Sequence, residues 1–197
     1  MPRVFRAAHV ITTDLCVRFP KLAAATWSIK SPWDDRYKCI AWAACHTGVQ
    51  WWPIRDSPVV HWPPGAPFDE SVDAFVLAFS TLGYKRCHSR VFEYGYQKVA
   101  IYAASDHQVL HMARQHFFGR GWLSKCGVLE DIQHADLDSV AGDPSPLVAA
   151  AGRTYGVVDT ILKRSWWAAL THLCVFRCAW AALRFWIYRT AYPSWDI

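Results

Sequence analysis

The stretch RYKCIAWAACH, residues 36–46, places a cysteine where a short polar run changes into a segment rich in Trp and Ala. Alanine favours helix, so a helix over residues 37–44 is predicted, with Asp34 or Asp35 as its N-cap. Cys39 then lies in the first turn, where backbone N–H groups and the positive end of the helix dipole favour thiolate over thiol. Cys39 is therefore the candidate nucleophile.

A cysteine nucleophile needs a base, and the chain contains nine histidines, most of them in or beside expected turns. His111 differs because it lies in the middle of an expected strand, QVLHMARQ, in the half of the chain that follows the cysteine. A Cys39–His111 pair is therefore the predicted nucleophile and general base. The competing interpretation is that both are buried core residues, as free cysteines often are.

A third polar group must orient the imidazole of such a pair. Glu130 or Asp131 in LEDIQH is the first choice, and Ser124 and His134 remain open alternatives. The carboxylates have a simpler explanation as well, because acidic residues are favourable at the start of a helical turn over residues 130–134.

A metal site is the rival chemistry for the same residues. Glu130 and His134 are four residues apart, so on a helix they share a face and could bind a metal together with His111. No HExxH or paired CxxC motif accompanies them, and the seven cysteines form no pattern of a disulfide framework or zinc ribbon. No metal and no cofactor are therefore predicted.

The whole-chain composition describes one packed domain. The chain has 197 residues, 53% of them hydrophobic and 19% charged, and a net charge of +5 from scattered Lys and Arg. This modest charge is compatible with an anionic partner or a membrane surface, and no nucleic acid partner is predicted. The first 20 residues have no continuous apolar run of a secretory signal, so a cytoplasmic location is expected, with signal-independent export left open.

The expected elements give an α+β domain, with the cysteine helix and a second helix packed on a small antiparallel sheet. Residues 69–82 form an amphipathic pattern, which Gly83 ends. The segments FEYGYQKVAIYAA, QVLHMARQHF and GWLSKCGVL then read as three strands of an antiparallel meander.

Two sets of residues are candidates for substrate contacts. A loop rich in Trp and Pro spans residues 50–67 and could shape a substrate groove with Trp51, Trp52 and Trp62. Arg114 and Lys125 lie inside expected strands, where they would bind an anionic group of a substrate or face solvent.

The chain ends in a segment of a different kind. Residues 157–190 read as apolar helix with Lys and Arg roughly along one side, and the longest uncharged run is too short to span a bilayer. A Trp- and Arg-rich helical extension over 165–197 is predicted, following a single domain over 1–164. It would pack on the domain, contact a membrane surface or mediate homo-oligomer contact.

Several blocks carry a family resemblance: YKCIAWAA, KVAIYA, LHMARQ, WLSKCG and LEDIQH, in this order between residues 37 and 164. They resemble the signature of an uncharacterised, mostly bacterial domain family. The order of a cysteine-bearing helix, a second helix and strands with a histidine is similar to papain-like (NlpC/P60-like) thiol hydrolases, which implies a papain-like arrangement by analogy. Cys45 and His46 depart from the family pattern, which tends to continue AWAAG, and the tail has no counterpart in it.

These observations lead to two functional hypotheses. The first is a cysteine-dependent hydrolase or acyl-transfer enzyme acting on an amide or isopeptide-like bond in protein, peptide or peptidoglycan, suited to a bacterial toxin or effector. The second is a non-catalytic binding or membrane-associated module that acts through the Trp-rich loop and the C-terminal helix.

Overall fold

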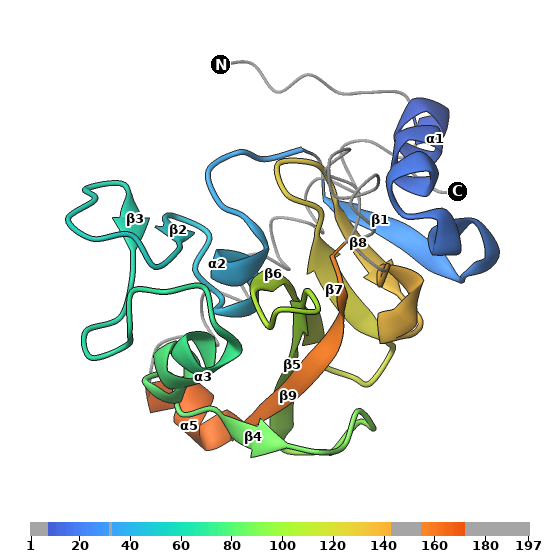
Figure 1. The fold of residues 1–197 in the computed structure, drawn as a ribbon. Coiled ribbons are helices and arrows are strands. Elements are labelled where there is room, and N and C mark those ends of the chain that lie inside the picture. The colour runs from blue at the N-terminus through green and yellow to red at the C-terminus, as the bar shows by residue number, and fades with distance from the viewer. Residues whose placement is uncertain (1–7, 32, 143–154, 172–197) are drawn as a thin grey trace.

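A seven-stranded sheet organises the chain, with the strand order β1-β8-β7-β6-β5-β9-β4 and antiparallel pairing throughout (Figure 1). The structure is a computed structural model and describes residues 8–31, 33–142 and 155–171. The strands are β1 (Trp27–Ser31), β4 (Lys85–Cys87), β5 (Tyr96–Ala103), β6 (Val109–Gln115), β7 (Trp122–Lys125), β8 (Asp131–His134) and β9 (Val157–Ser165). The architecture is thus a mixed α/β fold with a mostly antiparallel sheet and few helices.

The other elements are short. The α-helices are α1 (Ala8–Arg18), α2 (Cys39–Ala43), α3 (Val72–Ser80) and α5 (Trp166–Thr171), and the 3-10 helices are η1 (Pro20–Ala24) and η2 (Leu137–Ser139). Strands β2 (Gln50–Trp51) and β3 (Val60–His61) form a separate parallel pair within the Trp-Pro loop. No helix in the described ranges is long and apolar enough to cross a membrane.

The amphipathic helix and the three-stranded meander are confirmed. The Ser71 side chain caps α3 by accepting a hydrogen bond from the Ala74 N–H, and Gly83 follows the helix with a φ of +83°. Strands β5, β6 and β7 pair in sequence, as expected, and β8 continues the same meander.

Two helical expectations were wrong. Residues 157–165 form β9, which pairs with both β5 and β4, and residues 131–134 form β8 instead of a helical turn. Strand β9 buries three consecutive residues, Thr160, Ile161 and Leu162, so it shows no alternation, and β8 is only four residues long. The predicted C-terminal helix begins with α5, and its part after residue 171 lies outside the described residues.

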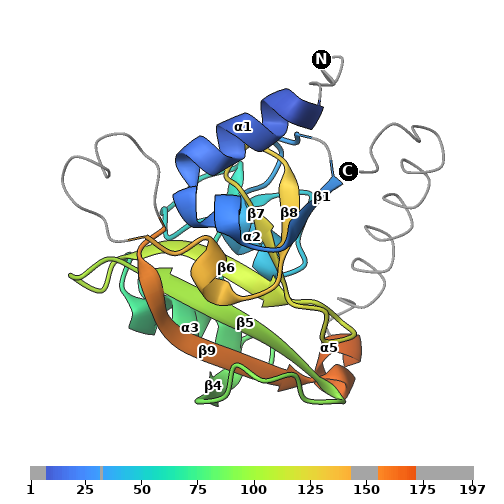
Figure 2. The same ribbon diagram turned by 90° about the vertical axis from the view of Figure 1, so that its right-hand side faces the viewer.

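The sheet has a hydrophobic core on each face. On one face α2 and α3 pack on Val99, Ile101 and Met112, and on the other α1 and η1 pack on Ala100 and Tyr102. Figure 2 shows α1 and α3 on opposite sides of the sheet. Because side chains alternate along a strand, neighbouring residues of β5 and β6 enter different cores.

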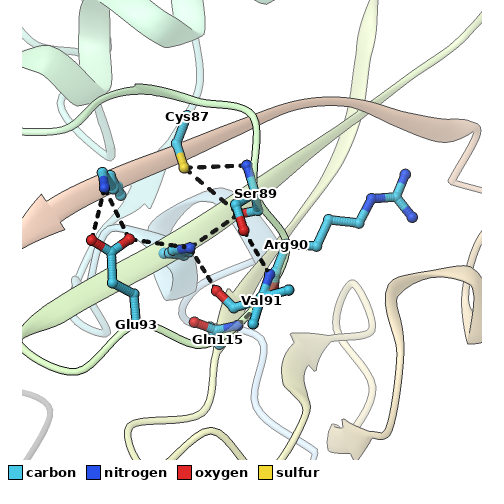
Figure 3. A network of polar contacts seen from close by, with 8 residues as sticks. Cys87, Ser89, Arg90, Val91, Glu93 and Gln115 are labelled. Carbon is cyan, nitrogen blue, oxygen red and sulfur yellow. Dashed lines mark hydrogen bonds and ion pairs between the residues drawn. The ribbon is translucent and has the colours of Figure 1, made fainter.

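Polar contacts hold the loop over residues 88–95 on the sheet, and Figure 3 shows Ser89, Val91 and Glu93 of this loop. Lys98 of β5 is 1% exposed, and its Nζ donates to the carbonyl oxygens of Ser89 at 3.1 Å and Val91 at 2.6 Å. Glu93 lies between two lysines, 3.5 Å from Lys98 Nζ and 2.9 Å from Lys163 Nζ. The loop is therefore held by charge-assisted bonds to β5 and β9.

Candidate functional site

Cys39 lies in the first turn of a helix, as expected, although α2 begins at Cys39 and not near Tyr37, and its surroundings keep it a thiol. Burial raises the pKa of Cys39, although backbone N–H groups of Met112 and Ile40 act in the opposite direction. Asp34 does not cap the helix, because it accepts hydrogen bonds from the backbone and guanidinium of Arg36, and Lys38 occupies the N-cap position without a side-chain cap. In a helix of five residues the dipole contributes little against the cost of burying a charge.

His111 lies on β6 and is fully buried. Its ring is stacked on Tyr155, with ring centroids 3.8 Å apart and planes 4° from parallel, and it also contacts Tyr102. Burial lowers the pKa of His111 well below its ordinary value, with a smaller effect from His134. His111 is therefore a neutral imidazole at neutral pH.

A chain of hydrogen bonds extends from His111 across two strands. Nε2 of His111 lies 3.0 Å from the Ser124 Oγ on β7, which lies 2.8 Å from Nε2 of His134 on β8. Nδ1 of His134 lies 2.6 Å from the carbonyl oxygen of Asp136. Burial lowers the pKa of His134 as well, so all members of this chain are neutral at neutral pH.

These hydrogen bonds fix the tautomer of each histidine. A carbonyl only accepts, so Nδ1 of His134 carries the proton and its Nε2 accepts the Ser124 hydroxyl proton. The Ser124 oxygen must then accept from Nε2–H of His111, which leaves the lone pair on Nδ1 of His111. This Nδ1 is buried and has no hydrogen-bond partner among the described residues. The imidazole of His111 is therefore held in one orientation, with the lone pair of Nδ1 directed away from Ser124.

Cys39 and His111 approach the same part of β6 from different sides. The His111 side chain shares its face with its cross-strand partner Tyr102, whereas Met112 belongs to the core under α2. The pairing of β6 with β7 begins at Ala113 and Ser124. Met112 precedes this pairing, and its backbone N–H contacts the Cys39 thiol. No hydrogen bond joins Cys39 to Nδ1 of His111 in this conformation.

Tyr155 packs against the His111 side of this site. Its ring is stacked on His111, and burial raises the pKa of the Tyr155 hydroxyl, with smaller effects from Cys126 and Cys39. The ring contact with His111 is the one interaction of Tyr155 with these candidate residues that has a defined geometry among the described residues.

Asp131 lies in a different polar cluster. Its carboxylate accepts a hydrogen bond from the Tyr37 hydroxyl at 3.3 Å and lies 3.6 Å from Nζ of Lys125, which also donates to the Leu129 carbonyl. Burial raises the pKa of Asp131 and outweighs the opposing effect of Lys125. Glu130 is buried beside it. Among the predicted third members, the one that forms a hydrogen bond with the His111 imidazole is Ser124, an alternative that the sequence left open.

The residues expected to contact substrate are mostly interior. Trp51 and Trp62 pack against Phe79 and Phe75 of α3, and the Trp52 indole donates to the Glu70 carboxylate. Lys125 belongs to the Asp131 cluster, and Arg114 is buried against α2. Trp51, Trp62, Arg114 and Lys125 are thus buried in this conformation, and Trp52 is half-buried.

Two features of the site escaped sequence reasoning. His134 was considered only as an alternative third member or a metal ligand, and its pairing with Ser124 depends on the β7–β8 register. Tyr155 lies in a loop-like segment with no pattern to mark it. Within the ranges that the structure describes, no group of three His, Cys, Asp or Glu side chains is arranged to hold a metal ion.

The fold and site define a class: an antiparallel-sheet domain in which a short cysteine-bearing helix meets a strand with an oriented, buried histidine. The chain belongs to a family described as a domain of unknown function (DUF7689), whose model matches residues 28–163. No curated protein and no solved structure matches the chain.

Proposed function

We propose that the protein is a cysteine-dependent hydrolase or acyl-transfer enzyme of papain-like type, in which Cys39 is the nucleophile and His111 the base. The observation that carries the proposal is the state of His111: Ser124 and His134 fix its Nε2 as a donor, and its basic Nδ1 has no hydrogen-bond partner among the described residues. The position of Cys39 at the N-terminus of α2 beside Met112 supports the pairing.

The reaction follows from these groups. The step requires a conformational change that brings Nδ1 of His111, which lies on the other side of β6, within hydrogen-bond reach of the Cys39 thiol. Nδ1 then takes up the thiol proton as the sulfur attacks a carbonyl carbon. The backbone N–H groups of Cys39 and Ile40 lie beside the sulfur and would stabilise the oxyanion. Nδ1 then returns the proton to the leaving amine, and water or a second amine releases the acyl group from the thioester. Substrates of this class are amide or isopeptide-like bonds in protein, peptide or peptidoglycan, and a bacterial toxin or effector would use such an enzyme.

Alkylation of Cys39 with iodoacetamide tests the proposal without a known substrate. We expect Cys39 to react at least about ten-fold faster in the wild-type chain than in His111→Gln, since the base increases the thiolate fraction. The matched control is Cys126, a second buried thiol near Tyr155, whose rate should not depend on His111. Equal rates at Cys39 and Cys126, both unaffected by His111→Gln, would refute the pairing.

A non-catalytic module remains the second candidate, and one observation favours it. Tyr94, Phe118 and Trp167 expose 82%, 70% and 80% of their surface near the start of α5, where the Trp166 ring contacts Tyr94 and Phe117. Exposed aromatic side chains of this kind suit binding to a partner or to a membrane surface. Co-sedimentation with anionic liposomes tests this function: Trp167→Ser combined with Phe118→Ser should weaken binding, and unchanged partitioning would remove the membrane form of the proposal.

A further inference from the structure

A second cysteine, Cys45, occupies an unusual backbone position at the end of α2. Its φ is +61°, and the helix closes around it with hydrogen bonds from the Cys45 N–H to the Trp42 carbonyl and from the His46 N–H to the Ala41 carbonyl. Glycine is favoured at this place in a helix end, and a residue with a side chain is strained there. The Cys45 side chain is nevertheless directed into the domain, and the residue is 2% exposed.

Two arginines converge on the Cys45 sulfur. Nη1 of Arg114 lies 2.8 Å from Sγ and Nη2 of Arg164 lies 3.8 Å from it. The two arginines are 6% and 2% exposed, so water screens this interaction poorly. Guanidinium groups only donate, so the sulfur accepts from both, and a thiolate accepts far better than a thiol.

The surrounding residues hold the arginines in this arrangement. Oε1 of Gln97 accepts from Nε and Nη2 of Arg164, at 3.0 and 2.6 Å, which turns the amide nitrogen of Gln97 to within 3.8 Å of the Cys45 sulfur. The guanidinium of Arg114 lies over the Trp42 ring and that of Arg164 over the Tyr84 ring, at 4.4 and 4.5 Å. Three donors from β5, β6 and β9 thus meet at one sulfur.

We propose that Cys45 is a thiolate bound by Arg114 and Arg164 and is a site of oxidation by small hydroperoxides. The sulfur attacks one oxygen of hydrogen peroxide, the S–O bond forms as the O–O bond breaks, and hydroxide leaves and takes up a proton from water. Sulfur is oxidised by two electrons to a sulfenic acid and the peroxide is reduced. The guanidinium N–H groups beside the sulfur stabilise the leaving hydroxide. Gln97, whose amide nitrogen lies 3.8 Å from the sulfur, is itself half-buried, and peroxide would reach the sulfur along this side chain.

The experiment treats the full chain with hydrogen peroxide at about pH 6, where an ordinary thiol is almost entirely protonated. A sulfenic acid-specific nucleophile traps the product, and peptide mass spectrometry assigns the modified cysteine. We expect the Cys45 adduct to exceed that of every other cysteine, and Arg114→Met to reduce it at least about ten-fold. The Cys39→Ser variant should leave the Cys45 adduct unchanged, which separates this site from the proposed nucleophile.

A stability series covers the case in which Arg114→Met does not fold. If the sulfur is anionic, Cys45→Asp keeps the charge opposite the two arginines and should lower the melting temperature less than the similarly small but neutral Cys45→Asn. The proposal is overturned if Cys45→Asn is at least as stable as Cys45→Asp, or if peroxide modifies the partly exposed Cys87 or Cys16 and leaves Cys45 unmodified.

Discussion

Ser124 has one hydroxyl proton and contacts two imidazoles, so it decides which nitrogen of each histidine is protonated. Ser124→Ala leaves Nε2 of His111 and Nε2 of His134 without this partner in a buried place. We expect a loss of about 1–3 kcal/mol in the free energy of unfolding, measured by urea denaturation. Nitrogen chemical shifts of the His111 ring should also show loss of the single Nε2–H tautomer. The exposed hydroxyl of Ser80 provides the control, and a His111 ring spectrum unchanged by Ser124→Ala would contradict the assignment.

The Tyr155 ring stacks on His111 and keeps water from it. Tyr155→Ala removes the stacked ring, so water and small reagents should reach His111 and the neighbouring Cys39. We expect faster alkylation of Cys39 in this variant than in the wild-type chain, measured by mass spectrometry over time. Tyr94→Ala serves as the control because Tyr94 is 82% exposed. If Cys39 reacts equally slowly after Tyr155→Ala, the aromatic ring does not limit access.

Among the elements, the loop over residues 88–95 is held in part by one buried side chain, Lys98 of β5. Lys98→Met removes the donor shared by the Ser89 and Val91 carbonyl oxygens. We expect faster amide hydrogen exchange in this loop and a loss of about 1–3 kcal/mol in stability, because the carbonyl groups lose their charged partner. Exchange in α3 should change much less.

The control for Lys98→Met is Lys85→Met, because Lys85 is exposed on the edge strand β4. If exchange in the loop is equally fast in the two variants and in the wild-type chain, Lys98 does not hold the loop.

The elements that could be predicted from the sequence are those in which apolar residues recur at a regular spacing and a cap or turn marks the end. The α3 helix has apolar residues at helical spacing, a serine cap and a glycine after it, and β5 to β7 are separated by evident turns. By contrast, β9 pairs on both sides and carries a run of buried residues, Thr160, Ile161 and Leu162, which a helix could bury equally well. Strand β8 has four residues, too few to show a period.

The candidate site was predictable only in part, for a related reason. Cys39 and His111 stand out because the start of a helix and the middle of a strand are local features. The contacts of Ser124 and His134 depend on the register of β6, β7 and β8, which a single sequence does not reveal. Asp131 illustrates the opposite error, because its charge suggested a partner for His111, whereas the fold places it with Tyr37 and Lys125.

For the whole molecule, the buried neutral histidines make stability depend on pH. The pKa values of His111 and His134 are lowered from an ordinary value of 6.5, mainly by burial. The unfolded chain therefore binds more protons than the folded one below about pH 6.5, and stability is fully present above that pH and lost as the pH falls toward the folded pKa values. Asp131 has the opposite effect, because its pKa is raised from 3.8 in the folded chain. Above pH 3.8 the folded chain binds this proton more strongly than the unfolded chain does, which reduces the increase of stability with pH.

We expect the free energy of unfolding, measured by urea denaturation, to decrease between about pH 6.5 and pH 5, by up to about 1.4 kcal/mol per pH unit for each histidine that stays neutral in the fold. His134→Gln removes one titrating group and keeps a side chain able to accept from Ser124, so its stability should fall less steeply over this range. His88→Gln alters an exposed histidine and should preserve the wild-type slope. If His134→Gln and the wild-type chain lose stability in parallel, His134 is protonated in the folded state, and the tautomer that leaves Nδ1 of His111 basic is no longer required.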